Sequence, residues 1–126
     1  MSSLKPLELG QARTELRRRL VNAVLRGEKT ATAGLLADFE AEGIQPGSVG
    51  DCRSLLGYDD EPVAVVEITE SRVVPAAEID EQFARDEGEG FASVEDWRVA
   101  HEDFFGRPIG PETQIVAVRF RVVEEL

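Results

Sequence analysis

The spacing of apolar residues predicts a helix over residues 12–26. Its apolar positions recur at the three- and four-residue intervals of one helical face, and they are Leu16, Leu20, Ala23 and Val24. This pattern places Arg17 and Arg18 on the outward face. Gly27 follows where a helix commonly ends, because glycine adopts a left-handed backbone without strain. Residues 35–42 are predicted to form a further helical turn.

Two more helices are expected in the second half of the chain. Residues 76–86 carry Ile79 and Phe83 four positions apart, and a glycine-rich break follows at residues 88–90. The next helix is predicted to begin at Ser93, since an acid three residues later completes a capping arrangement. Four residues share one face of that helix: Trp97, Ala100, His101 and Phe104.

The strand signal is strongest over residues 63–69, a continuous run rich in β-branched side chains. Residues 72–74 are expected to continue the sheet after a turn, residues 52–56 to form a shorter strand, and residues 114–123 a long final one. Residues 29–33 are predicted to be irregular or briefly extended. Strands and helices do not alternate as in a parallel sheet, so we predict an α+β fold with a mainly antiparallel sheet.

The length of 126 residues fits a single domain, which we place at residues 1–126. The net charge of −11 is unevenly distributed, because residues 1–30 have a local charge of +4 and residues 76–104 a local charge of −8. An acidic protein repels the phosphates of long nucleic acids, so RNA binding would depend on the local basic segment. The run Arg17–Arg19 in that segment suits either a solvated helix face or a phosphate contact.

No apolar run approaches the roughly 20 residues that a membrane-spanning helix needs. Residues 1–5 are not followed by a long apolar stretch, so no signal peptide is expected. Cys52 is the only cysteine and His101 the only histidine, which excludes an internal disulfide and argues against a zinc site. We therefore expect a cytoplasmic protein with no cofactor, metal or membrane association, and leave its oligomeric state open.

Several polar side chains lie next to helix ends or on apolar faces, where they could line a cleft. They are Lys29, Thr30, Thr32, Glu87, Trp97, His101 and Arg119. Each also has an ordinary explanation. Lys29 follows a helix C-terminus, whose dipole favours a cation, and Arg119 could alternate outward from an apolar strand. Spacing alone therefore indicates a cleft without identifying its chemistry.

Gly27, Lys29 and Thr32 form the pattern G-x-K-x-x-T. This pattern resembles the signature of the ASCH family. The similarity continues in order along the chain, at residues 49–51, 63–69, 83–90, 97–105 and 116–122. The resemblance implies a PUA-like, mainly antiparallel β-barrel with about three short helices, and a link to RNA or to modified nucleosides.

One small bacterial branch of that family hydrolyses N4-acetylcytidine to cytidine and acetate with a lysine, a threonine and a glutamate. By resemblance these catalytic residues are Lys29, Thr32 and Glu87. The remaining candidates are expected to contact the substrate: Thr30, Trp97, His101 and Arg119. Over residues 88–105 the chain is longer than that branch, and it looks more like a second bacterial branch for which ribonuclease activity has been suggested.

Amide hydrolysis requires a nucleophile, a proton shuttle and stabilisation of an oxyanion. Thr32 could supply a hydroxyl, and Lys29 could take its proton only while neutral. Glu87 would favour the charged lysine or, if itself protonated, could donate to the leaving amine. Because residues three apart on an extended strand face opposite sides, Lys29 and Thr32 converge only if the backbone turns between them.

Three functions remain open at this point. The leading one is an amidohydrolase of an N-acylated, cytidine-like nucleoside, which carries no phosphate for an acidic chain to repel. The second is an RNA-binding or RNA-cleaving domain that uses the basic N-terminal segment. The third is a non-catalytic sensor of a small nucleoside-like ligand.

Overall fold

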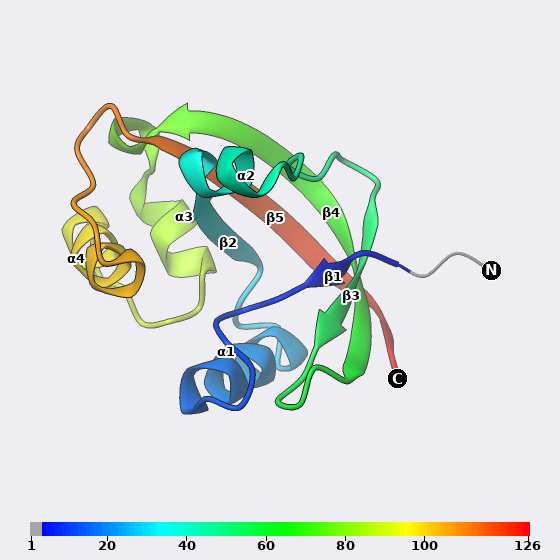
Figure 1. The fold of residues 1–126 in the computed structure, drawn as a ribbon. Helices are drawn as coiled ribbons and strands as arrows, with labels where there is room; N and C mark the ends of the chain where they lie inside the picture. The colour runs from blue at the N-terminus through cyan, green and yellow to red at the C-terminus, as the bar shows by residue number, and fades with distance from the viewer. Residues whose placement is uncertain (1–3) are drawn as a thin grey trace.

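The computed structural model describes residues 4–126, so residues 1–3 of the segment considered for a signal peptide lie outside it. Five strands form one curled sheet with helices packed against it (Figure 1). Across the sheet the strands follow the order β1 (Pro6–Leu7), β3 (Cys52–Leu56), β4 (Pro62–Pro75), β5 (Gln114–Glu125) and β2 (Ala31–Leu35). β1 pairs with β3 in parallel, and the other pairings are antiparallel. The expected α+β fold is confirmed, with β1 and β2 as the edges of a half-barrel.

The long strands β4 and β5 connect two separate hydrophobic cores. Their pairing shifts register between Ile68 and Glu70, and such a bulge lets a long strand bend. On one side of this point, α1 (Glu15–Leu25) packs on the sheet. The first core is formed by Leu9, Leu20, Val21, Val24, Leu55, Ala64, Val66 and Phe120.

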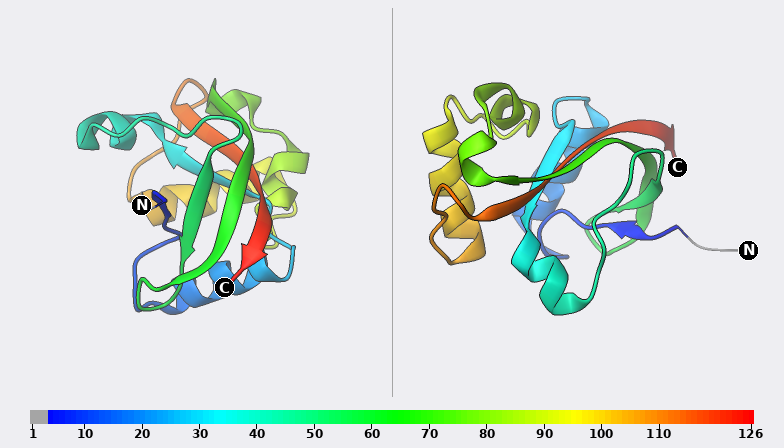
Figure 2. Two further views of the ribbon diagram at one scale, coloured as in Figure 1. Left: turned by 90° about the vertical axis from the view of Figure 1, so that its right-hand side faces the viewer. Right: turned by 90° about the horizontal axis from the view of Figure 1, so that it is seen from above.

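The second core lies at the other end of β4 and β5, against η1 (Ala76–Glu78), α3 (Glu81–Asp86) and α4 (Val94–Phe105). Its large side chains include Ile79, Phe83, Trp97, Ile109 and Ile115. Figures 1 and 2 show α3 and α4 next to one another at this end of the sheet. The expected turn of helix after β2 is α2 (Leu36–Glu42). No helix among residues 4–126 is long and apolar enough to cross a membrane.

The helix predicted over residues 76–86 is two shorter elements. Ile79 has an extended backbone, and the Asp80 carboxylate accepts a hydrogen bond from the Phe83 amide at the start of α3. A short acidic side chain favours such a cap over a helix interior, which explains the break. Ile79 and Phe83 are nevertheless both buried, as their spacing indicated. Residues 72–74 are likewise part of the continuous β4 and not of a separate strand after a turn.

The helical pattern indicated that Arg17 faces outward, but in the structure this residue is fully buried. Its guanidinium donates to four acceptors: the carbonyls of Leu9, Gly10 and Gly57 at 2.8, 3.0 and 2.9 Å, and the carboxylate of Asp60 at 2.9 Å. The guanidinium has five donors in a fixed plane, so it can satisfy several carbonyls of neighbouring loops at once. Periodicity could not reveal these partners, because they come from the backbone of distant segments. Only Arg18 and Arg19 of the basic run are exposed.

Candidate functional site

Two helix C-termini bring the candidate lysine and glutamate together. Lys29 follows α1, and Glu87 is the C-cap residue of α3. The amide of Thr30 donates to the Asp86 carbonyl at 2.7 Å, which ties the two segments to one another. Lys29 and Glu87 are 58 residues apart in the sequence, and the fold places both side chains in one buried cluster.

Gly88 permits the close approach of these segments. Its φ of +69° is left-handed, and a Cβ at this position would lie 2.4 Å from the carbonyl oxygen of Glu28 and 2.7 Å from the Cα of Lys29. Any other residue would be strained and would also collide with the backbone beside Lys29. The glycine-rich break after α3 is therefore part of the construction of the site.

The ammonium group of Lys29 is surrounded by oxygen acceptors, and the residue is only 2% exposed. The Nζ donates to the carbonyls of Ala31 and Glu87, at 2.8 and 3.2 Å. It also lies 3.5 Å from Glu87 Oε1 and 3.4 Å from Glu89 Oε2. An ammonium has three donors and no acceptor, so this environment suits the charged form of the lysine.

Glu87 is 1% exposed and receives donors on both carboxylate oxygens. Trp97 donates its indole N–H to Oε2, and His101 Nε2 lies 3.4 Å from Oε1. Burial alone would raise the pKa of Glu87, but the hydrogen bond from His101, the charge of Lys29 and the Trp97 N–H outweigh burial and hold the pKa below its usual value. Glu87 is therefore an ionised acceptor, which argues against a protonated Glu87 as the donor to a leaving amine.

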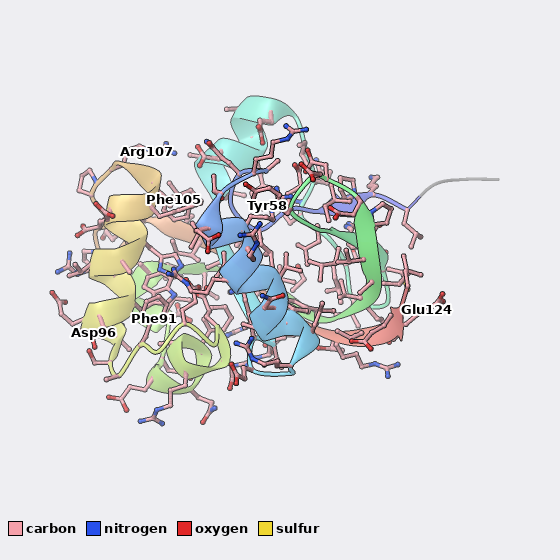
Figure 3. The ribbon with its side chains drawn as sticks, turned by 90° about the horizontal axis from the view of Figure 1, so that it is seen from below. Tyr58, Phe91, Asp96, Phe105, Arg107 and Glu124 are labelled. Atoms are coloured by element: carbon pink, nitrogen blue, oxygen red, sulfur yellow. The ribbon has the colours of Figure 1, made fainter. Side chains whose placement is uncertain are left out.

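Trp97 and His101 lie on the inward face of α4, as their spacing indicated, but neither offers a free surface to a base. Their rings stack with centroids 4.4 Å apart, and Trp97 is 1% exposed. Phe91 and Phe105, which Figure 3 labels, place their rings 5.7 and 5.8 Å from that of His101. Protein rings and Glu87 therefore surround Trp97 in this structure and leave no exposed ring face for the expected contact with a substrate.

Thr32 is not part of the buried cluster. Ala31 and Leu35 on β2 face the second core, and strand residues alternate, so Thr32 faces the other side of the sheet. Among residues 4–126, no hydrogen bond joins the Thr32 side chain to Lys29 or Glu87. The structure thus brings two of the three expected catalytic residues together and leaves the third on the opposite face of β2.

Thr30 and Arg119 both contact Asp86, the last residue of α3. The Thr30 hydroxyl lies 3.4 Å from the Asp86 carbonyl oxygen, while the Arg119 guanidinium binds the Asp86 carboxylate and donates to Glu70 at 2.9 Å. Arg119 also lies over the Phe83 ring, 5.3 Å from its centroid. Both residues hold Asp86, the neighbour of Glu87, so their contacts position the site.

Sequence reasoning missed Asp86 and Glu89, which contribute to the site on either side of Glu87. Asp86 anchors the end of α3, and Glu89 supplies the second carboxylate near Lys29. Residues 76–104 contain ten acids, so no single one stands out in the sequence. Within residues 4–126, no group of three or more His, Cys, Asp or Glu side chains is arranged to hold a metal ion.

A surface hollow of about 330 Å³ adjoins Lys29. Its apolar lining includes Val24, Leu25, Phe120 and Val122, and its charged lining includes Arg26 and Arg121. Glu87, Trp97 and His101 do not line this hollow, so Lys29 is the residue that the hollow and the buried cluster share. The volume lies at the lower end of the range of small-molecule sites.

Three solved structures have a fold similar to that of this chain. Protein EF3133 from Enterococcus faecalis V583, described by the family model DUF984, is 26% identical with a TM-score of 0.86, and the match covers 99% of this chain and 79% of that one. An ASCH domain from Lactobacillus crispatus JV V101 is 26% identical with a TM-score of 0.82, covering 98% and 81%. The hypothetical protein PH0355 shares the fold, with 17% identity, a TM-score of 0.61, and coverage of 86% and 94%.

No curated protein matches this sequence significantly. The family model of the ASCH domain matches residues 7–124, which is nearly the whole chain. This match agrees with the solved ASCH domain structure and with the resemblance first seen around Lys29. The chain therefore belongs to the ASCH domain family.

Proposed function

We propose that this protein is an amidohydrolase of N-acylated, cytidine-like nucleosides, with N4-acetylcytidine as the reference substrate. Membership of the ASCH family suggests a hydrolase-like or RNA-binding activity. The observation that carries the proposal is the buried ion pair between Lys29 and Glu87, with Nζ and Oε1 3.5 Å apart. Buried ion pairs contribute little net stability compared with apolar residues of similar volume, so a pair of this kind is a candidate for a functional role.

Lys29 is the residue through which a substrate in the hollow would meet this charge cluster. Its ammonium could stabilise the oxyanion that forms when the amide carbonyl is attacked. Glu87 and Glu89 surround the ammonium with acceptors, and this arrangement favours an electrostatic role over the general-base role considered from the sequence. Glu87 would then orient the Lys29 ammonium.

Thr32 is the candidate hydroxyl, and the geometry of β5 supports a place for it near the substrate. Thr32 pairs with Val118, which lies on the same face of β5 as Phe120 two residues later. Phe120 lines the hollow beside Lys29. A substrate that extends from the hollow along this face of the sheet would therefore approach Thr32 without entering the buried cluster.

Turnover by purified protein tests the proposal. We expect the wild type to release cytidine and acetate from N4-acetylcytidine in a chromatographic assay of several acylated nucleosides. Lys29→Ala and Thr32→Ala should abolish this release, whereas Arg19→Ala, a change at an exposed position, should not. If no acylated nucleoside is hydrolysed by the wild type, the proposal is wrong.

Lys29→Arg separates the two roles of the lysine. Arginine keeps the positive charge but cannot act as a base, because its guanidinium does not lose its proton in proteins. Turnover near that of the wild type would exclude general-base catalysis by Lys29 and support the electrostatic role. Complete loss of turnover with unchanged nucleoside binding would favour the base.

RNA binding is the second candidate, and the outer surface of α1 favours it. Arg18, Arg19, Asn22 and Arg26 line a second hollow of about 270 Å³, with Glu15 as its acidic member. Arg26 also lines the hollow beside Lys29, so the basic surface continues towards the candidate site. The net charge of −11 opposes this function, and only a local contact could overcome it.

Salt dependence distinguishes the two functions. Binding of a short RNA through arginine contacts should weaken steeply as salt concentration rises, because the contacts release counterions. The double variant Arg19→Ala/Arg26→Ala should reduce that slope. Turnover of an uncharged nucleoside should change little over the same salt range.

A further inference from the structure

The two nitrogens of the His101 ring both face oxygen atoms. Nδ1 lies 2.7 Å from the Trp97 carbonyl oxygen, and Nε2 lies 3.4 Å from Glu87 Oε1. A carbonyl oxygen only accepts, and so does an ionised carboxylate, whereas a neutral imidazole has a single N–H. Both contacts can be hydrogen bonds only if the ring carries two protons and is therefore an imidazolium.

We propose that His101 is a positioning residue, which in its doubly protonated form donates to Glu87 and thereby holds the Glu87 carboxylate in place against Lys29. Only the expected effect of His101 on turnover rests on the proposed function, whereas its effect on the position of Glu87 does not. Loss of the Nε2 proton would turn a lone pair of the ring towards the carboxylate. Glu87 would lose one of its three donors, and its orientation towards Lys29 would be released.

The charges around His101 favour the protonated ring. Glu87 faces it from the end of α3, Glu89 follows on the next loop, and Lys29 lies beyond Glu87 from the segment after α1. Burial alone would lower the pKa of His101, but the hydrogen bond to Glu87 and the charges of Glu87 and Glu89 outweigh it and raise the pKa above its usual value of 6.5. The contacts of both ring nitrogens and the surrounding charges therefore both favour a protonated, positively charged His101.

Trp97 contacts the same carboxylate, so its indole resonance is sensitive to the state of Glu87. Its indole N–H donates to Glu87 Oε2, while His101 faces Oε1 of that group. The chain contains one tryptophan and one histidine. One indole resonance and one imidazole ring therefore observe the two oxygens of Glu87 without any assignment problem.

A pH titration of the ¹⁵N-labelled protein followed by NMR tests the proposal. We expect both ring nitrogens of His101 to be protonated at pH 6, with a midpoint above 6.5. The Trp97 indole resonance should shift with the same midpoint. In Glu87→Gln the His101 midpoint should fall below that of the wild type, because the carboxylate is gone and burial remains. A midpoint that Glu87→Gln does not move, or an indole resonance that does not follow the titration, would overturn the proposal.

Turnover gives a second readout that a merely structural role would not move. We expect an alkaline decline of kcat on N4-acetylcytidine at the NMR midpoint, with little change in KM. His101→Gln keeps a donor but cannot titrate, so its kcat should be about ten-fold lower and the alkaline decline should disappear. Phe105→Leu, which alters packing against the same ring, should keep the decline.

The outcomes separate the two proposals. If His101 and Trp97 titrate together as expected but no acylated nucleoside is hydrolysed, the proposed function fails and the positioning of Glu87 stands. If hydrolysis occurs and His101→Gln keeps the pH profile of the wild type, the positioning role of His101 fails and the proposed function stands.

Discussion

Arg17 and Lys29 are the two buried basic side chains among the lysines and arginines of residues 4–126, and they are satisfied in different ways. Arg17 donates mainly to backbone carbonyls, and its carboxylate partners Asp60 and Glu8 have side chains that are 47% and 57% exposed. Lys29 is paired with the carboxylate of Glu87, and both side chains are 1% exposed. One cation ties loops together, and the other forms an ion pair that is shielded from water.

The difference shows that burial of a cation does not by itself indicate a functional site. A guanidinium saturated by carbonyls has a fixed charge and little freedom to do chemistry. A lysine paired with a buried carboxylate lies in a region of low dielectric, where each charge strongly affects its neighbours. The following changes measure how much each buried cation and its neighbours contribute to the free energy of unfolding.

Arg17→Met should have the largest effect on stability. Three main-chain carbonyls would lose their donor, so we expect a loss of about 3–4 kcal/mol in the free energy of unfolding. Urea denaturation measures this loss, and Arg19→Met, on the exposed face of α1, is the matched control with little effect. A loss below about 1 kcal/mol for Arg17→Met would contradict the role of Arg17 as a tie between loops.

Gly88→Ala should have the second-largest effect, a loss of about 2–4 kcal/mol in the free energy of unfolding. The loss arises because alanine is strained in the left-handed backbone and its Cβ would collide with the segment before Lys29. Gly90 is a matched control, because its φ of +85° is also left-handed but a Cβ there would meet nothing within 4 Å. Gly90→Ala should therefore cost only about 1 kcal/mol. Equal losses in thermal or urea unfolding would show that the contact of Gly88 with the Lys29 segment is unimportant.

Lys29→Met should cost less than either change, about 1–3 kcal/mol. The change would leave a buried Glu87 that loses one donor and retains His101 and Trp97. The double variant Lys29→Met/Glu87→Gln should lose less than the sum of the single variants, because the unpaired charge is removed. Strict additivity in urea unfolding would mean that the two side chains do not interact.

The smallest effect is a dependence of the free energy of unfolding on pH. Because the pKa of Glu87 is lowered from 4.5, its contribution is present above that value and is lost as pH falls through the lower folded pKa. Because the pKa of His101 is raised from 6.5, its contribution is fully present below 6.5 and is lost as pH rises through the higher folded pKa. The stabilisation is therefore greatest between about 4.5 and 6.5.

The comparison of wild type with His101→Gln measures this effect. The wild type should lose stability relative to the variant as pH rises above 6.5, because only the wild type loses the proton on residue 101. Urea midpoints at three or four pH values are sufficient. A constant difference between the two proteins over that range would contradict the coupling of His101 to Glu87.

Local patterns predicted much of the fold. The strand at residues 52–56 is found with those bounds, and the final helix begins after Ser93, whose side chain accepts a hydrogen bond from the Asp96 amide. Periodicity could not predict the two-residue β1, which is too short to carry a pattern and forms by pairing with β3. It also could not predict the break at Ile79, where a side-chain cap competes with helix continuation.

The site was predicted less completely. Family resemblance identified Lys29 and Glu87, which lie together, but the side chains that surround them come from tertiary contacts. Trp97 and His101 have the spacing of any inward helical face, and nothing in that spacing shows that both donate to one carboxylate. Their contacts with Glu87 depend on the packing of α3 against α4, which the spacing along α4 does not contain.

The position of β5 governs the order in which the molecule can assemble. β5 is the last strand along the chain, yet it lies inside the sheet between β4 and β2. During synthesis β2 therefore has no neighbour to pair with until residues 114–125 have emerged, and its exposed edge must wait for them. The segment that carries Lys29 runs directly into β2, so its final position depends on a pairing between two segments that lie far apart in the sequence.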